Sequence, residues 1–178
     1  MESLRFLATT TLSGTSTSVT FSNIDSETYQ DLFFLIAART DRASVGVDFA
    51  ELRVNGDAGA SYTSRGVYRS DSSATTAFNN ASGTGSIYDG AMTTASTSST
   101  SWMGAARCWL YNIGDTSSGK LWQADGFAEG FVSYLSGNWQ NYDKVTSVTF
   151  LPGTGTNFTA NSTFTMYGLI APFPKVSQ

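Results

Sequence analysis

Two carboxylates, Asp125 and Glu129, are the residues of this chain best suited to covalent chemistry. Both flank apolar residues of apparent strands, and a pair of carboxylates is the machinery that most glycosidases use. One carboxyl group of such a pair is the general acid, and the other is the nucleophile or general base. The alternative is that both are solvent-facing strand and loop carboxylates. We favour this alternative, because the sequence does not show the separation that catalysis requires.

The chain contains no histidine, which removes the commonest general base of enzymes. Ser-His-Asp and Cys-His catalysis, and most zinc and iron sites, need an imidazole. No glycine-rich phosphate loop is followed by Lys and a helix, because Gly153 and Gly155 belong to a turn between strands. We therefore expect no enzymatic activity and no cofactor.

Oxygen ligands for calcium could come from Asp41 with Asp48, or from Asp115 with its neighbouring hydroxyls. No loop has the D-x-D-x-D-G pattern of a calcium site, and so we expect no metal. The single cysteine, Cys108, lies in the apolar run WMGAARCWLY. That setting favours a buried, inert thiol over a reactive one.

A sugar-binding role is suggested by residues 139–143, WQNYD, because Trp and Tyr can stack on sugar faces while Asn, Asp and Gln bond to hydroxyls. The alternative for Trp139 and its neighbours is a packed loop cap, and we favour it. The N-x-[ST] matches at Asn80, Asn157 and Asn161 are expected by chance in a chain so rich in Ser and Thr.

Composition and charge restrict the partners. The net charge of −4 comes without any basic run, and so we expect no nucleic-acid binding. No stretch approaches the roughly 20 apolar residues of a membrane helix, and the start of the chain is too weakly apolar for a signal peptide. We expect a soluble protein made in a cytoplasm. Charged residues are only 13% of the chain, which leaves few side chains to keep copies apart and favours assembly.

Alternating apolar and polar residues predict strands throughout the chain. Residues 145–170 are expected to form two strands and a turn, with Val148 and Phe150 on one face of the first. Residues 31–39 are apolar at both odd and even positions, which predicts a central strand buried on both faces. Further strands are expected at 17–21, 47–55, 101–112, 120–124 and 126–134.

These strands predict an all-β fold, an antiparallel β-sandwich of about eight strands with jelly-roll topology. An immunoglobulin-like sandwich is the second choice, but the chain lacks its paired cysteines. The sequence TSVTF occurs at 17–21 and again at 146–150, either by chance or because the two segments occupy equivalent inward-facing places. The predicted core comprises Phe34, Leu52, Leu110, Phe150, Phe164 and Met166.

We expect one sandwich domain over residues 1–170, with a long excursion at 58–100 and an extended tail at 171–178. The excursion is either an ordered segment with minor strands or a low-complexity disordered tract. Its small residues give it little to gain by folding back on its own domain. The tail carries Phe173 and Pro174, an apolar anchor on a segment that prolines keep extended. We expect these two residues to contact another subunit, and the alternative is that the tail packs on its own sandwich.

Several segments of the chain resemble virion structural proteins of tailed phages, particularly cyanophages. They are TSVTFSNIDSETYQDLFFLIAART, ELRVNGDAGASY, WLYNIGDTSSGK and NWQNYDKVTSVTFLPGTGTNFTANSTFTMYGLI. The closing strand is similar in its pattern of Phe158, Ser162, Tyr167, Gly168 and Leu169. The likeness leaves out residues 58–100.

The resemblance implies a non-enzymatic jelly-roll protein of a phage virion, either a capsid decoration or cement protein or a short fibre or spike subunit. The domain begins almost at the first residue, which favours a small accessory protein over the end of a long fibre. Such a protein is expected to form a homo-oligomer, with a trimer as the expected state, and to bind other virion proteins such as the major capsid protein. The alternative implied by the family is a carbohydrate-binding module that recognises a host surface glycan.

Overall fold

The computed structural model describes residues 3–43, 46–70, 75–84, 86–94 and 102–170. Twelve β-strands run through these ranges. They are β1 (Leu4–Thr11), β2 (Val19–Ser22), β3 (Tyr29–Ala38), β4 (Val47–Val54), β5 (Tyr62–Ser70), β6 (Thr76–Thr84), β7 (Ile87–Thr94), β8 (Gly104–Tyr111), β9 (Lys120–Ala128), β10 (Phe131–Trp139), β11 (Ser147–Pro152) and β12 (Thr163–Ile170). The described residues contain no helix, and so none long and apolar enough to cross a membrane.

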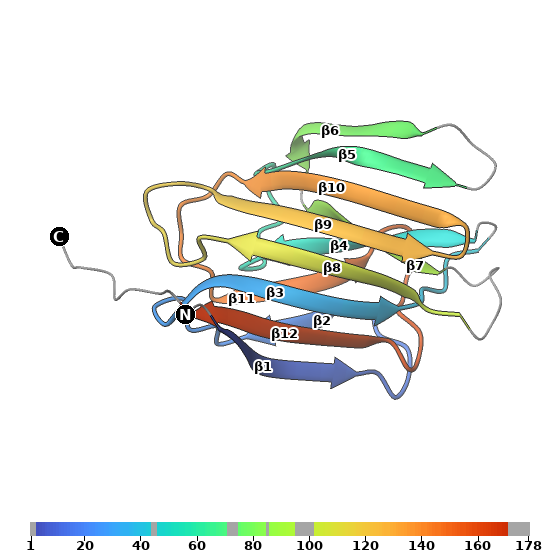
Figure 1. Cartoon of the computed structure of the whole chain (residues 1–178), viewed down its shortest axis with the longest axis horizontal. Coiled ribbons are helices and arrows are strands. Elements are labelled where there is room, and N and C mark those ends of the chain that lie inside the picture. Colours follow the sequence, from blue (N-terminus) through green and yellow to red (C-terminus); the bar gives the residue numbers. More distant parts are fainter. Residues whose placement is uncertain (1–2, 44–45, 71–74, 85, 95–101, 171–178) are drawn as a thin grey trace.

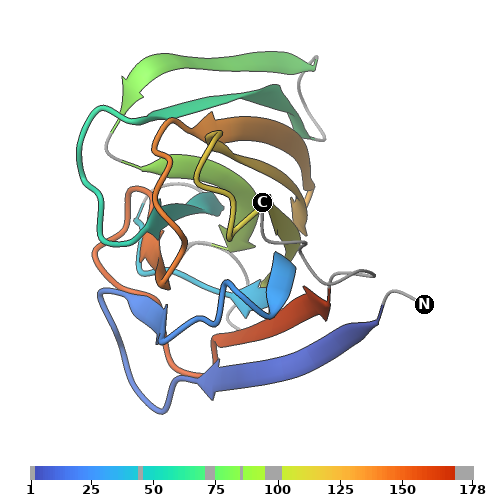
Figure 2. The ribbon, with the colours of Figure 1, turned by 90° about the vertical axis from the view of Figure 1, so that its left-hand side faces the viewer.

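The strands form two antiparallel sheets that pack as a sandwich. The larger sheet has eight strands in the order β1-β12-β3-β8-β9-β10-β5-β6, and the smaller has four in the order β2-β11-β4-β7. Figure 1 looks onto the larger sheet, with the smaller sheet behind it, and Figure 2 shows the two layers after a quarter turn. The all-β sandwich predicted from the sequence is confirmed.

The strand order identifies the sandwich as a jelly roll with additions. Without β5, β6, β9 and β10, eight strands remain, and they lie as β1-β12-β3-β8 in one sheet and β2-β11-β4-β7 in the other. First and last strands are thus neighbours in one sheet, and second and next-to-last strands are neighbours in the opposite sheet. This is the jelly-roll arrangement of eight strands in two sheets. The four other strands extend the larger sheet beyond β8.

The expectation that residues 145–170 form two strands joined by a turn is correct for the strands, but they do not pair as a hairpin. β11 pairs with β2 and β4, whereas β12 pairs with β1 and β3 in the opposite sheet. The apolar faces of the two strands meet across the core, where the rings of Phe150 and Phe164 lie 5.5 Å apart. Between them Phe158 is fully buried and bridges to Ser16 and Thr40.

The two TSVTF segments lie side by side in the smaller sheet. Val19 pairs with Phe150 and Phe21 pairs with Val148 in an antiparallel register. All four of these side chains are buried, with exposed fractions of 4% or less. The interpretation that the repeated segments occupy equivalent inward-facing places is confirmed.

The core lies between the two sheets. The predicted core residues Phe34, Leu52, Leu110, Phe150 and Phe164 are fully buried, and Met166 is 5% exposed. The ring of Phe34 lies 5.2 Å from that of Phe150 across the two layers. Cys108 is also buried, as predicted.

The described residues within 58–100 are part of the sandwich rather than an excursion away from it. β5 and β6 pair with each other and extend the larger sheet through β10, and β7 pairs with β4 to complete the smaller sheet. The expectation that this segment gains little by folding back is therefore wrong. Its backbone gains ladder hydrogen bonds on both sheets, and these do not depend on large apolar side chains.

The boundaries predicted for the strand at 126–134 are also wrong. β9 continues to Ala128, the chain reverses at Glu129 and Gly130, and β10 runs on to Trp139 through the segment expected to be a loop. Gly130 has a φ of 71°, a conformation that suits glycine at a tight reversal. β9 and β10 are therefore a long hairpin, and β5 from the other insertion pairs with its outer edge.

Candidate interaction face

The structure does not bring Asp125 and Glu129 together as a catalytic pair. Asp125 lies within β9, and its Oδ2 is 2.8 Å from Nη2 of Arg107 on the neighbouring β8. Glu129 lies in the turn after β9, four residues along the chain, which corresponds to about 13 Å of extended strand. The ion pair with Arg107 accounts for Asp125 without a catalytic role.

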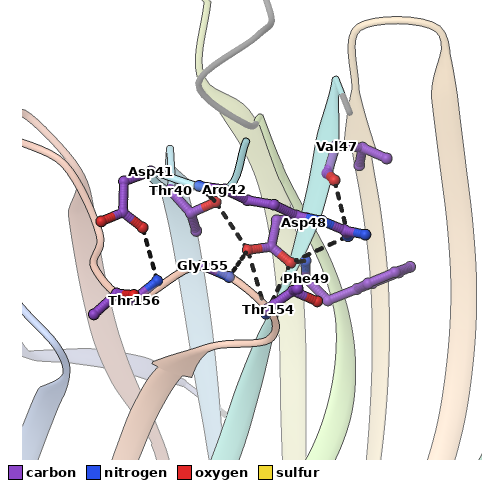
Figure 3. Close-up of polar contacts among 9 residues, drawn as sticks. All are labelled: Thr40, Asp41, Arg42, Val47, Asp48, Phe49, Thr154, Gly155 and Thr156. Atoms are coloured by element: carbon purple, nitrogen blue, oxygen red, sulfur yellow. Dashed lines mark hydrogen bonds and ion pairs between the residues drawn. The ribbon is translucent and has the colours of Figure 1, made fainter. Parts of the chain in front are cut away.

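The carboxylates of Asp41 and Asp48 hold the turn that follows β11 (Figure 3). Asp41 Oδ1 accepts hydrogen bonds from the backbone N–H groups of Thr156 and Asn157 at 2.7 and 2.9 Å. Asp48 Oδ2 accepts one from the N–H of Gly155 at 2.9 Å, and Oδ1 accepts one from that of Thr154 at 3.1 Å. These two predicted calcium ligands thus bind the turn itself.

Asp48 is completely buried, and further donors surround it. The hydroxyl of Thr40 donates to its Oδ2 at 2.9 Å, the N–H of Phe49 donates to its Oδ1 at 2.9 Å, and Nη1 of Arg42 lies 3.5 Å away. A buried carboxylate is tolerated only when such partners compensate for its lost hydration. Asp48 is therefore a structural residue that ties β4 to the turn.

Asp115 likewise organises its own loop. The backbone N–H and the hydroxyl of Ser117 donate to its Oδ1, and the hydroxyl of Ser118 donates to its Oδ2. The bonds from Ser118 and Ser117 hold the pKa of this carboxyl well below its usual range. Lys120 is buried beside it, and its ammonium donates to the carbonyls of Asp115 and Ser118. The described residues include no cluster of three or more His, Cys, Asp or Glu that could hold a metal ion.

Trp139, the centre of the predicted sugar site at 139–143, is a core residue. Its ring is fully buried against Tyr62, with centroids 6.5 Å apart. Its indole N–H donates to Oδ2 of Asp57 at 2.7 Å. Only Tyr142 exposes a large ring in this segment, with 60% of its surface free. A buried Trp139 cannot stack on a sugar, and so the packed alternative describes this residue.

The predicted assembly contacts Phe173 and Pro174 lie outside the described residues. The structure instead draws attention to the outer face of the larger sheet, the face that points away from the core and toward the viewer in Figure 1. A sheet with one side in water normally alternates apolar residues inward with polar residues outward. Here large apolar side chains also point outward along several strands. Exposed ones among them are Leu4, Phe6, Leu35, Val67, Leu121, Phe127, Val132 and Tyr134.

Four of these side chains form what we call the apolar patch: Leu35, Val67, Phe127 and Val132. Phe127 of β9 pairs with Val132 of β10, and both are more than half exposed, at 58% and 57%. Val67 of β5 lies in the same row across the sheet as Leu35 of β3, with β8, β9 and β10 between them. Leu35 and Phe127 line one hollow of the face, and Val132 and Val67 line another, so Phe127 and Val132 connect the two ends of the patch. Exposed apolar surface of this kind marks interaction sites in soluble proteins.

A charged pair lies in the middle of the same row. Nε and Nη2 of Arg107 both donate to Oδ2 of Asp125, at 3.1 and 2.8 Å. The adjacent row toward the other end of the strands is aromatic, because Phe33 lies between Tyr167 and Trp109, with ring centroids 6.1 and 4.6 Å away. The outer face therefore combines an apolar patch, a self-neutralised ion pair and a row of rings.

Sequence reasoning missed this face, although β3 carries a signal for it. Residues 31–39 are apolar at both odd and even positions, which predicted a strand buried on both sides. β3 is central in its sheet, as expected, and its inward residues Leu32, Phe34 and Ile36 are buried. Its outward residue Leu35 is 39% exposed, however, and so burial on both faces is wrong for the isolated chain. An apolar strand that has one open face indicates a surface available to a partner.

No protein-family model matches the sequence, and no curated protein matches it either.

Proposed function

We propose that this chain is a non-enzymatic structural protein of a tailed-phage virion. In this proposal it is a capsid decoration or cement subunit, or a short fibre or spike subunit, that acts through protein–protein contacts. The observation that supports it best is the apolar patch on a rigid sheet face. The resemblance to cyanophage virion proteins supports the setting, and the jelly-roll fold agrees with it without specifying a function.

The energetics of the patch are those of a docking surface. Fully burying a side chain such as Phe, Leu or Val contributes about 1.5–3 kcal/mol, and the patch offers four such side chains, from β3, β9, β10 and β5 of one sheet. They lie on hydrogen-bonded strands, and so little order is lost when a partner covers them. Phe127 and Val132 would lie at the centre of the contact.

The partners we propose are further copies of this chain, as a homo-oligomer with a trimer as the expected state, and other virion proteins such as the major capsid protein. The protein would be made in the host cytoplasm and would reside in the virion. A catalytic role is not part of the proposal, because Asp125 is engaged by Arg107 and the chain contains no histidine.

The virion setting is tested by quantitative mass spectrometry of gradient-purified particles of the phage that encodes the chain. The proposal predicts that peptides from this chain co-purify with the major capsid protein at a fixed ratio. Their absence from particles that retain their other structural proteins would overturn the virion role.

The role of the patch is tested by sedimentation velocity on a double variant, Phe127→Ser with Val132→Ser. The wild-type chain should form an oligomer that the double variant loses, while the control Tyr142→Ser, which removes an exposed ring outside this face, leaves the oligomer intact. A wild-type chain that is monomeric and does not bind purified capsids, or a double variant that assembles normally, would contradict the proposal.

A further inference from the structure

The outer face also carries a shallow hollow, which begins at the Arg107–Asp125 pair and extends along the strands away from Phe127. Its floor consists of Phe33 on β3 with Trp109 and Tyr111 on β8. The ring of Trp109 lies 4.6 Å from that of Phe33, and its plane is within 8° of that of Tyr111, with centroids 6.0 Å apart. The Phe33 ring is tilted by 34° to that of Trp109. We call this cluster of three rings the aromatic platform.

Polar side chains from three strands form the wall of this hollow: Arg107, Gln123, Asp125 and Tyr134. They fix one another, because Arg107 donates two hydrogen bonds to Asp125, and the amide nitrogen of Gln123 donates to the hydroxyl of Tyr134. Each pair retains hydrogen-bonding atoms that a ligand can use. Within the described part of the chain, Oδ1 of Asp125 and Oε1 of Gln123 accept no hydrogen bond, and Nη1 of Arg107 donates none.

The charge of the hollow restricts its ligand. Arg107 and Asp125 neutralise each other at 2.8 Å, with 62% and 32% of their side chains exposed. An anionic ligand would have to compete with Asp125 for the guanidinium, and a cation would have to compete with Arg107 for the carboxylate. A neutral ligand with hydroxyl groups can use the open donor and acceptors without breaking the pair.

We propose that this hollow binds a neutral saccharide. The C–H face of a pyranose ring is apolar and flat and would lie on the Trp109 and Tyr111 rings of the aromatic platform, as apolar groups stack on aromatic faces. Its hydroxyls both donate and accept, which matches acceptor atoms on Asp125 and Gln123 and a donor on Arg107. The side chains that meet the sugar are already held by their neighbours, and so binding orders few rotamers.

The saccharide would be bound and not cleaved. Asp125 is the one carboxylate among the described residues that line the hollow, whereas most glycosidases use two. The site adjoins the apolar patch, because Arg107 and Asp125 lie two residues along β8 and β9 from Ala105 and Phe127. Its aromatic floor extends away from the patch as far as Tyr111, six residues from Ala105, or about 20 Å of strand. The inference does not depend on the virion role.

A printed array that carries neutral and sialylated or uronic-acid glycans tests the proposal, followed by titration calorimetry with the best neutral oligosaccharide. We expect binding to neutral glycans. We expect no binding that depends on a sialic acid or a uronic acid. Trp109→Ala and Asp125→Asn should each weaken binding by about tenfold or more, as loss of a central contact does. Tyr142→Ala is the matched control, an exposed ring outside the hollow whose removal should leave affinity unchanged.

Gln123→Ala keeps the test decisive if Trp109→Ala fails to fold, since it removes a surface amide and leaves the platform in place. The proposal is overturned if no neutral glycan binds above background, or if binding survives both Asp125→Asn and Gln123→Ala. Binding that requires a carboxylated sugar would overturn it as well.

Discussion

Replacing Asp48 by Asn should destabilise the fold much more than replacing Asp41 by Asn, although both carboxylates hold the same turn. Asp48 is completely buried and accepts backbone N–H bonds from Phe49, Thr154 and Gly155. Asp41 is only partly buried, and water can replace what it loses. The comparison therefore isolates the contribution of burial at nearly constant side-chain shape.

The magnitude for Asp48→Asn follows from the donors around it. A carboxylate has two acceptor oxygens, whereas an amide has one acceptor and an NH2 group that can only donate. The NH2 group must face a backbone N–H, which removes a charge-assisted bond of about 1.5–3 kcal/mol and leaves a buried donor unpaired at about 1–3 kcal/mol. Arg42 also loses the opposite charge 3.5 Å away. The expected total is about 3–5 kcal/mol, the range for a broken buried pair.

Urea unfolding monitored by tryptophan fluorescence measures this difference. Asp48→Asn should lower the unfolding midpoint with an unchanged m-value, and it should lower the Tm by about 10 °C for a chain of this size. Asp41→Asn should cost about 1 kcal/mol, because its amide oxygen still accepts from Thr156 and Asn157. A loss below about 1 kcal/mol for Asp48→Asn, or equal losses for both variants, would refute the reasoning.

Three further results are expected. Phe150→Ala should cost about 3–5 kcal/mol in urea unfolding because it empties the core, and a loss under 1 kcal/mol would contradict that packing. Gly137→Ala should lower the Tm sharply, since a Cβ there would lie 1.9 Å from the carbonyl oxygen of Thr63; a wild-type Tm would show that the strands can separate. The indole N–H of Trp139 lowers the pKa of Asp57 below its ordinary 3.8, so the protein should be stabilised above that pH and lose this stability as pH falls through the lower folded-state pKa. Asp57→Asn should reduce this loss in the free energy of unfolding at acid pH. An unchanged loss would contradict the assignment.

The core of the jelly roll was predictable because its signal is local. Val148 and Phe150 alternate with hydroxyl residues, and such alternation marks a strand with one buried face. The pairing of β11 with β2, rather than with β12, was not predictable in this way. Consecutive strands of a jelly roll mostly lie in opposite sheets, and nothing in the turn at 152–157 distinguishes a crossing from a hairpin.

The added strands and the candidate site were hidden for a different reason. β6 consists largely of Ser, Thr, Asn and Gly, and β5 mixes Ser, Thr and Gly with Tyr, Arg and Val, and so neither strand shows a clear apolar face in the sequence. Their place in the sheet depends on pairing with β10, whose residues lie far along the chain. The hollow joins Phe33, Trp109 and Gln123 across three strands, and only the register brings these residues together. Leu35 carried the one local signal, an apolar residue on the outer side of β3.

A cryo-EM reconstruction of the phage particle tests the central claim, that this chain is a virion component that docks through its outer sheet face. The account predicts density for the jelly roll with Phe127 and Val132 buried against a neighbouring subunit. Density in which these two side chains face solvent, or particles without the chain, would contradict it.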